Sequence, residues 1–196
     1  MKLLDVLLNE NIQITSKEGM TKNGKPYKVV LLTSTIISPS TTAMIEAFNH
    51  IKWGKADMIV SGGSDAAITE SGIGGFSSLK ALSTRNEDPK TASRPFDVNR
   101  DGFVMGEGAG AIILEEYEHA IKRGAKIYAE VIGGGQKGDA YHLTSTHPEG
   151  LGAQLGMKEA LDEAGITPDE VDYINMHATS TPIGDPSELI ESSNTF

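Results

Sequence analysis

The chain has 196 residues, of which 38% are hydrophobic and 22% charged, a composition typical of a globular domain with an apolar core. Its net charge of -10, without a basic stripe, argues against binding to nucleic acid. It contains no cysteine, which excludes disulfides, thiolate metal ligands and a cysteine nucleophile on this chain. No apolar run is long enough to cross a membrane and no signal-peptide cleavage site is recognisable, so we expect a cytoplasmic protein without a membrane partner.

The N-terminal segment 1–28 is the hardest part of the chain to interpret. Asn23-Gly24 is typical of a hairpin turn, and it is flanked by strand patterns at 12–15 and 27–32. A hydroxyl-rich loop follows, and the apolar spacing after it predicts a helix at 43–53.

Three stretches resemble ligand-binding motifs and fail in a critical feature. Residues 19–26 follow the phosphate-binding P-loop up to Pro26, which lacks the hydroxyl that coordinates Mg²⁺. Residues 97–108 follow a calcium loop, but Gly108 stands in place of the bidentate glutamate, so we expect aspartates that cap a turn. The glycines at 106–111 precede a strand rather than follow one, unlike a dinucleotide fingerprint. A nucleotide-binding or metal-binding protein is an alternative that rests only on these stretches, and we expect no metal site.

Strand and helix patterns alternate through the rest of the chain. We expect a strand at 56–60 closed by Gly62-Gly63, a glycine-rich segment at 66–82 with a short helix at its end, and a surface loop at 83–95. Further on we expect a strand at 111–114, a helix at 115–123, a strand at 127–131, a helix at 152–165 and a strand at 171–175. This alternation favours an α/β layered domain.

The loop between Ile174 and Glu188 carries the side chains that most favour a functional site. It contains His177 and three hydroxyl residues, Thr179, Ser180 and Thr181. Asp185 is expected to be the N-cap of the following helix, since proline comes next and glutamate stands three residues later. In α/β proteins such strand-to-helix loops line the crevice where ligands bind, and an ordinary polar loop is the alternative.

Several long blocks of sequence occur in a recognisable order between residues 54 and 189. They are GKADMIVSGGSDAAIT, GIGGFSSLKALSTRN, TASRPFDVNRDGFVMGEGAGAIILEEYEHA, RGAKIYAEVIGGG, DAYHLTSTHPEG and HATSTPIGD. Together they resemble the β-ketoacyl-[acyl-carrier-protein] synthases. The resemblance implies an incomplete thiolase-like α/β fold, whose two halves stack as αβαβα layers. Segment 1–28 matches it poorly, and 29–196 matches parts of both halves.

The resemblance also implies a reaction. In that family a cysteine at a helix N-terminus accepts the acyl group from the phosphopantetheine thiol of an acyl-carrier protein. Two histidines then assist the decarboxylation of malonyl-carrier protein and the condensation that elongates the fatty acid. The implied activity is an acyltransferase that needs no separate cofactor. Its implied partners are the acyl-carrier protein and either a second copy of the chain or a full-length synthase.

Site residues follow from the same resemblance. His177 falls on the histidine of the family's HGTSTP motif, with Ala178 replacing the glycine. Phe76 falls on an aromatic residue that borders the acyl pocket, a role compatible with simple core packing. Four hydroxyl residues fall on positions that line the pantetheine tunnel: Thr144, Ser145, Thr179 and Thr181.

Two departures from the family predict that the chain is inactive by itself. The nucleophile position falls on Ile37, which cannot be acylated, and no base is evident that could activate Ser38 or Ser40. The family's second histidine and a nearby lysine lie beyond Phe196. A non-catalytic partner subunit that docks with an active synthase, like the chain-length factors, is the alternative. We also expect open sheet edges that favour association.

Overall fold

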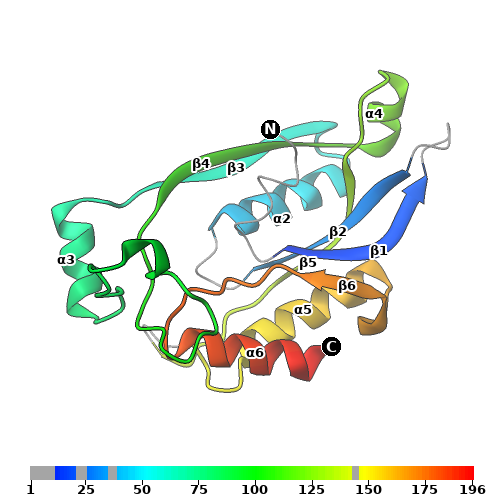
Figure 1. Ribbon diagram of the computed structural model, residues 1–196. Helices are drawn as coiled ribbons and strands as arrows, with labels where there is room; N and C mark the ends of the chain where they lie inside the picture. Colours follow the sequence, from blue (N-terminus) through cyan, green and yellow to red (C-terminus); the bar gives the residue numbers. More distant parts are fainter. Residues whose placement is uncertain (1–11, 21–25, 35–38, 143–145) are drawn as a thin grey trace.

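The computed structural model describes residues 12–20, 26–34, 39–142 and 146–196 (Figure 1). Its strands are β1 (Ile12–Met20), β2 (Pro26–Ser34), β3 (Met58–Ala66), β4 (Glu107–Glu115), β5 (Ala129–Gln136) and β6 (Val171–Ile174). Its helices are α2 (Pro39–Lys52), α3 (Glu70–Ser78), α4 (Tyr117–Lys122), α5 (Leu151–Ala164) and α6 (Gly184–Thr195), with short 3₁₀ turns at Pro89–Thr91 and Pro168–Glu170.

Two sheets and the helices between and beneath them form alternating layers. The larger sheet has the order β5-β2-β1-β6, in which β5 and β2 are parallel and the other neighbours antiparallel. The smaller sheet is the antiparallel pair β3-β4. Helix α2 lies between the two sheets, while α5, with α6 against it, covers the opposite face of the larger sheet (Figure 1). The α/β class expected from the alternating patterns is therefore confirmed.

The strands predicted on either side of Asn23-Gly24 are also confirmed. β1 and β2 pair antiparallel, from Ile12 opposite Leu32 to Met20 opposite Pro26. The turn between them, like the segment 1–11, lies outside the described residues.

Three successive glycines in β5 allow helices to approach both faces of the larger sheet. A Cβ atom on Gly135 would stand 1.8 Å from the carbonyl oxygen of Gly156 in α5. A Cβ atom on Gly134 would stand 3.1 Å from the side chain of Ile45 in α2. Successive side chains point to opposite faces of a strand, so one glycine serves each helix in turn.

The glycines expected to bound strands lie inside them. β3 continues through Gly62 and Gly63, β4 contains Gly108 and Gly110, and β5 contains the three glycines described above. A Cβ atom on Gly62 would stand 2.1 Å from the carbonyl oxygen of Gly110 in the neighbouring strand. The predicted strand boundaries are wrong because glycines such as Gly62 and Gly135 allow neighbouring segments to approach closely within a strand and do not form turns.

Two helices begin earlier than predicted. The helix expected at the end of 66–82 is instead α3, which starts after Thr69. The Thr69 hydroxyl accepts a hydrogen bond from the Gly72 amide at 3.1 Å, a typical N-cap. Helix α2 starts at Pro39 because proline is compatible with the first turn of a helix.

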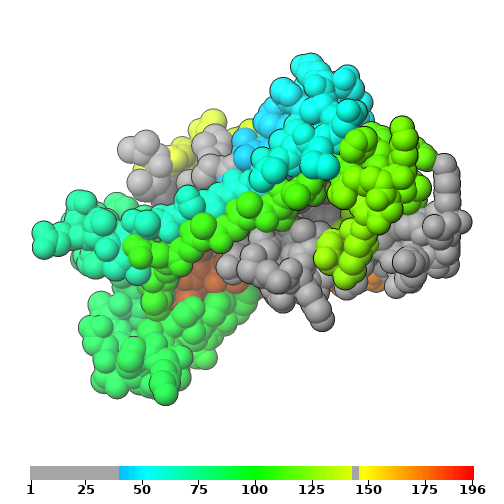
Figure 2. All heavy atoms as spheres, turned by 90° about the horizontal axis from the view of Figure 1, so that it is seen from above, coloured from blue at the N-terminus to red at the C-terminus, as the bar shows by residue number. Residues whose placement is uncertain are grey.

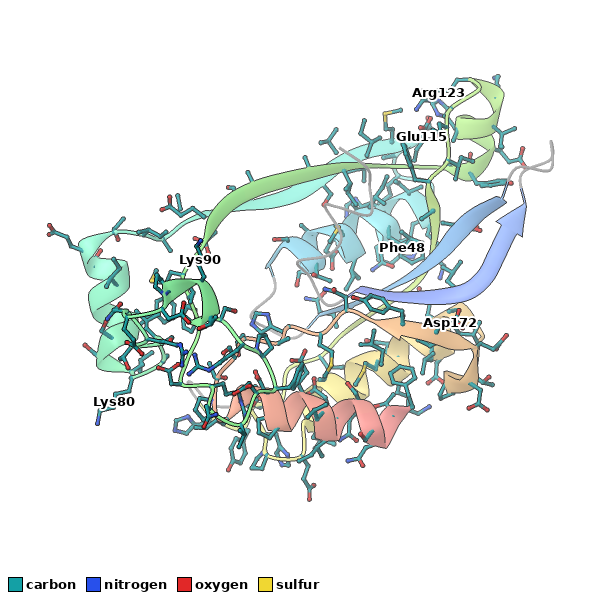
Figure 3. The ribbon with its side chains drawn as sticks, in the orientation of Figure 1. Phe48, Lys80, Lys90, Glu115, Arg123 and Asp172 are labelled. Carbon is teal, nitrogen blue, oxygen red and sulfur yellow. The ribbon has the colours of Figure 1, made fainter. Side chains whose placement is uncertain are left out.

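Glu115 at the end of β4 fixes the short helix that follows (Figure 3). Its carboxylate accepts two hydrogen bonds from the Arg123 guanidinium, at 2.7 and 2.6 Å, and lies 2.6 Å from Nδ1 of His119. The bonds from Arg123, reinforced by His119, lower the pKa of Glu115 to about 2. The helix predicted at 115–123 is therefore shorter, because Glu115 belongs to the strand and anchors α4 from outside.

Helix α5 confirms the prediction at 152–165 most closely. It ends at Ala164 and is capped by Gly165, whose φ of 67° is the left-handed conformation typical of a residue that stops a helix. Ala160 and Leu161 on its inner face are buried, and they pack with Ile166 just beyond the helix. This cluster forms the core beneath the larger sheet.

The outward face of the β3-β4 sheet is open (Figure 2). Val60 and Ile113 lie directly opposite each other across the two strands, and 68% and 59% of their surfaces are exposed. In the part of the chain that the structure describes, no helix has both the length and the apolar character needed to span a bilayer.

Candidate functional site

The loop at 175–183 connects β6 to α6, the strand-to-helix position predicted for it. Two of its non-glycine residues, Ala178 and Ser180, have φ angles of 46° and 66°. This left-handed backbone costs free energy for residues with a side chain, and it persists only when neighbouring groups hold it in place. The contacts around the loop provide that support.

Glu188 of α6 holds the backbone of the histidine. Its carboxylate is buried and accepts hydrogen bonds from the amides of His177 and Ala178, the second at 2.7 Å. Two converging amides bound to one carboxylate fix the direction of the peptide between them. The His177 side chain remains exposed, so its imidazole is presented to the outside on a rigid backbone.

The hydroxyl groups of the loop divide into two sets. Thr179 and Thr181 lie with their hydroxyl oxygens 2.9 Å apart, and Thr181 also accepts a hydrogen bond from the Gly184 amide at 3.0 Å. Ser180 is fully buried and accepts from the Arg94 amide at 3.1 Å. The two threonines are half-buried, while the fully buried serine fastens the loop from within.

Asp185 does not have the role predicted from the sequence. Helix α6 begins at Gly184, so Asp185 lies in the first helical turn, and the Thr181 hydroxyl binds the Gly184 amide in its place. The Asp185 side chain is 1% exposed and lies 3.2 Å from Nε of Arg100. The N-cap prediction is wrong because this ion pair draws the carboxylate inward, away from the helix end.

Arg100 joins a second loop, residues 92–102, to the loop at 175–183, which is called the histidine loop below. Its guanidinium donates to the carbonyl oxygens of Thr181 and Pro182 at 3.0 and 3.2 Å. The Phe96 amide donates to the Asp185 carboxylate at 2.7 Å. The sequence-based prediction did not include this network, in which Arg100 is the one member from the stretch that resembles a calcium loop.

The aspartates of that stretch cap backbone amides, as predicted. Asp97 accepts from the Asn99 amide at 2.7 Å, and Asp101 accepts from the Thr84 amide at 2.9 Å. Hydrogen bonds from the Ser83 hydroxyl and the Thr84 amide hold the pKa of Asp101 below its usual range. The stretch thus makes a turn in which the aspartates bind backbone amides.

Phe76 lies in α3, where its ring makes an edge-to-face contact with Phe103 at a centroid distance of 5.0 Å. The amide of Gly102, the residue before Phe103, donates to the carbonyl oxygen of Ser180 at 3.1 Å. Phe103 of this aromatic pair therefore directly follows a residue whose backbone is hydrogen-bonded to the histidine loop. Its predicted role in an acyl pocket stays a prediction.

Most of the remaining predicted site residues fall in segments that the structure does not describe. Ile37, Ser38, Thr144 and Ser145 lie outside the described residues. Ser40, in the first turn of α2, packs against Gly63 of β3, where a Cβ atom would stand 2.2 Å from its hydroxyl oxygen. The structure thus brings together His177, Thr179 and Thr181.

This arrangement suits hydrogen bonding to a polar, extended ligand. An exposed imidazole can donate to a carbonyl or enolate oxygen, where negative charge develops. Thr179 and Thr181 share one hydrogen bond, which uses the O–H of one of them, so the other O–H of the pair can donate to a ligand. The loop can therefore donate hydrogen bonds to the oxygen of a polar ligand.

Comparison with known proteins identifies relatives of both parts of the chain. Residues 29–120 match the model of the β-ketoacyl synthase N-terminal domain, and residues 128–196 match that of its C-terminal domain. The chain is 55% identical over 155 residues to the chloroplastic 3-oxoacyl-[acyl-carrier-protein] synthase II of Arabidopsis thaliana, covering 79% of this chain and 29% of the relative. It is 51% identical over 164 residues to 3-oxoacyl-[acyl-carrier-protein] synthase 2 of Staphylococcus aureus, covering 84% and 40%.

Two solved structures are similar in fold. A β-ketoacyl synthase from Burkholderia phymatum STM815 superposes with a TM-score of 0.77 at 38% identity, covering 84% of this chain and 40% of that one. A ketosynthase bound to a hexaketide, in complex with its type II PKS acyl-carrier protein, gives a TM-score of 0.74 at 42% identity, covering 76% and 37%. The chain thus spans well under half the length of the relatives it matches.

Proposed function

Because the chain belongs to the β-ketoacyl synthase family and has part of its thiolase-like α/β fold, we propose that it contributes to a 3-oxoacyl-[acyl-carrier-protein] synthase of fatty-acid elongation. The observation that carries the proposal is the loop at 175–183, where Glu188 holds the backbone of His177 and leaves the imidazole exposed. The substrates of such an enzyme are acyl and malonyl groups carried on the phosphopantetheine of acyl-carrier protein.

His177 has the role of a hydrogen-bond donor in this proposal. As malonyl-carrier protein loses carbon dioxide, negative charge develops on the thioester oxygen. A donor whose backbone is already fixed stabilises that charge without reorganising, which is the basis of oxyanion-type catalysis. The contact between Glu188 and the amides of His177 and Ala178 supplies that fixed backbone.

Thr179 and Thr181 have the role of binding the pantetheine arm, whose amides offer donors and acceptors along its length. Thr181 is oriented by the Gly184 amide, and Thr179 is oriented by Thr181. We extend the tunnel-lining role to Thr144 and Ser145, and the acyl-pocket role to Phe76.

The chain lacks a cysteine to accept the acyl group, and we assign Ile37 to the position of that nucleophile. We therefore propose that this chain does not form an acyl-enzyme itself and that condensation requires a nucleophile from a full-length synthase. The second candidate, a non-catalytic partner subunit, is favoured by the same missing cysteine. Co-purification of the chain with a full-length synthase would support this second role.

Binding to acyl-carrier protein tests the proposed function. We expect carrier protein bearing a non-hydrolysable acyl-pantetheine amide to shift the backbone amide resonances of His177 and Thr179. Replacing Thr179 with valine should raise the dissociation constant by about fivefold to tenfold, because one hydrogen bond is lost. The control is Thr195→Val, since the Thr195 hydroxyl donates to the Glu191 carbonyl within α6. Equal affinity of the two variants, or no shift in the loop, would contradict the proposal.

A further inference from the structure

β5 is the end strand of the larger sheet, so one side of its backbone faces no other described strand. Two of its amides donate instead to side chains of α5. The Gly134 amide donates to Oε2 of Glu163 at 2.8 Å, and the Gln136 amide donates to Oε2 of Glu159 at 2.9 Å. A row of backbone donors that would attract another strand is thus bound to carboxylates.

The spacing of helix and strand explains how both amides are reached. Residues four apart on a helix are separated by about 6.0 Å along its axis. Residues two apart on a strand are separated by about 6.6 Å. The close approach of Gly135 to Gly156 brings α5 against the sheet, so the neighbouring row, Glu159 and Glu163, overhangs the edge.

Two lysines complete this closure. Lys52 of α2 lies 2.7 Å from Glu163, and Lys137 lies 2.6 Å from Glu159. Since α2 and α5 cover opposite faces of the sheet, the Lys52–Glu163 ion pair crosses its edge. Burial acts to raise the pKa of Glu159, but the hydrogen bonds from Lys137 and the Gln136 amide hold it below its usual range. The carboxylate is therefore ionised at neutral pH.

We propose that Glu159 and Glu163 close the β5 edge against strand addition, and that their removal lets this edge pair with the β5 edge of a second copy. An edge strand pairs with its own copy in the antiparallel direction, because the same donors and acceptors then face each other. The glycines at 133–135 have no side chains to obstruct that approach. In the native chain the carboxylates of two such edges would meet as like charges and would lose their bonds to the amides.

The double variant Glu159→Ala/Glu163→Ala tests this inference. Hydrogen exchange at low protein concentration should become about tenfold faster at the Gly134 and Gln136 amides, matching the loss of one hydrogen bond at each. Sedimentation should show a self-association constant at least tenfold higher than that of the native chain. The charge-matched control is Asp162→Ala/Asp169→Ala, which removes two exposed carboxylates near the same helix and should change neither measurement.

Unchanged exchange at both amides, or the same self-association as the control, would overturn the inference. A variant that loses its cooperative melt is replaced by Glu159→Asp/Glu163→Asp, which keeps both charges and shortens their reach by one methylene. This variant should also exchange faster at the two amides, and native exchange rates in it would equally overturn the inference.

Discussion

Replacing Arg100 with methionine is expected to lower the free energy of unfolding by about 3–5 kcal/mol, the usual cost of breaking a buried ion pair from one side. Asp185 is 1% exposed, and without Arg100 the Phe96 amide would be the one hydrogen-bond donor left to its carboxylate among the described residues. The substitution also removes the donor to the Thr181 carbonyl, so the histidine loop should loosen. Urea denaturation followed by circular dichroism measures the effect.

The control for this prediction is Lys158→Met. Lys158 forms an ion pair with Asp162 at 2.9 Å on the exposed side of α5, with side chains 69% and 65% exposed. Its loss should change the free energy of unfolding by no more than about 0.5 kcal/mol. Adding Asp185→Asn to the Arg100 variant should recover part of the lost stability, because it removes the uncompensated charge. A loss below about 1 kcal/mol for the Arg100 variant would show that the pair does not hold the two loops together.

The second large effect is a fall in stability of about 2–3 kcal/mol as the pH rises from 5 to 8. Burial, and then the negative charge of Glu188, raise the pKa of Glu191 to about 8 from an ordinary value of 4.5. Between these values the folded chain holds a proton that the unfolded chain releases, so a higher pH favours unfolding. The full shift corresponds to about 5 kcal/mol, and the partial exposure of Glu191 reduces it.

Glu191→Gln should flatten this pH dependence and stabilise the chain at pH 8. The matched control is Glu149→Gln, which replaces an exposed carboxyl close to Gly150 and should retain the slope. The Glu191 carboxyl packs against Gly150, since a Cβ atom on Gly150 would stand 2.6 Å from Oε2 of Glu191. A native chain whose stability is constant from pH 5 to 8 would contradict the assignment. So would a Glu191 variant with an unchanged slope.

The sequence predicted those helices and strands whose determining residues lie within the element itself or next to its ends. Helix α5 has an apolar face of regular helical spacing and a glycine stop, and both appear in the structure. The position of His177 between a strand and a helix also followed from local pattern. These features depend on neighbours within a few residues, which a sequence displays directly.

Features that depend on distant partners were not predictable in the same way. Gly62 resembles a turn residue, but it lies within β3 because Gly110 of β4 approaches it closely. Asp185 resembles an N-cap, but Arg100 from another loop draws its carboxylate inward. The roles of Glu159 and Glu188 likewise depend on which backbone amides the fold brings within reach. Residue type alone does not identify those partners.

In the proposed function this chain supplies the histidine loop of a condensing site but not its acyl nucleophile. Intact-mass spectrometry after incubation with acyl-carrier protein loaded with a labelled acyl group tests it most directly. A full-length synthase that has its cysteine is the positive control, and it should gain the mass of one acyl group. We expect no gain in mass for this chain. A stable, hydroxylamine-sensitive acyl adduct on it would contradict the proposed role.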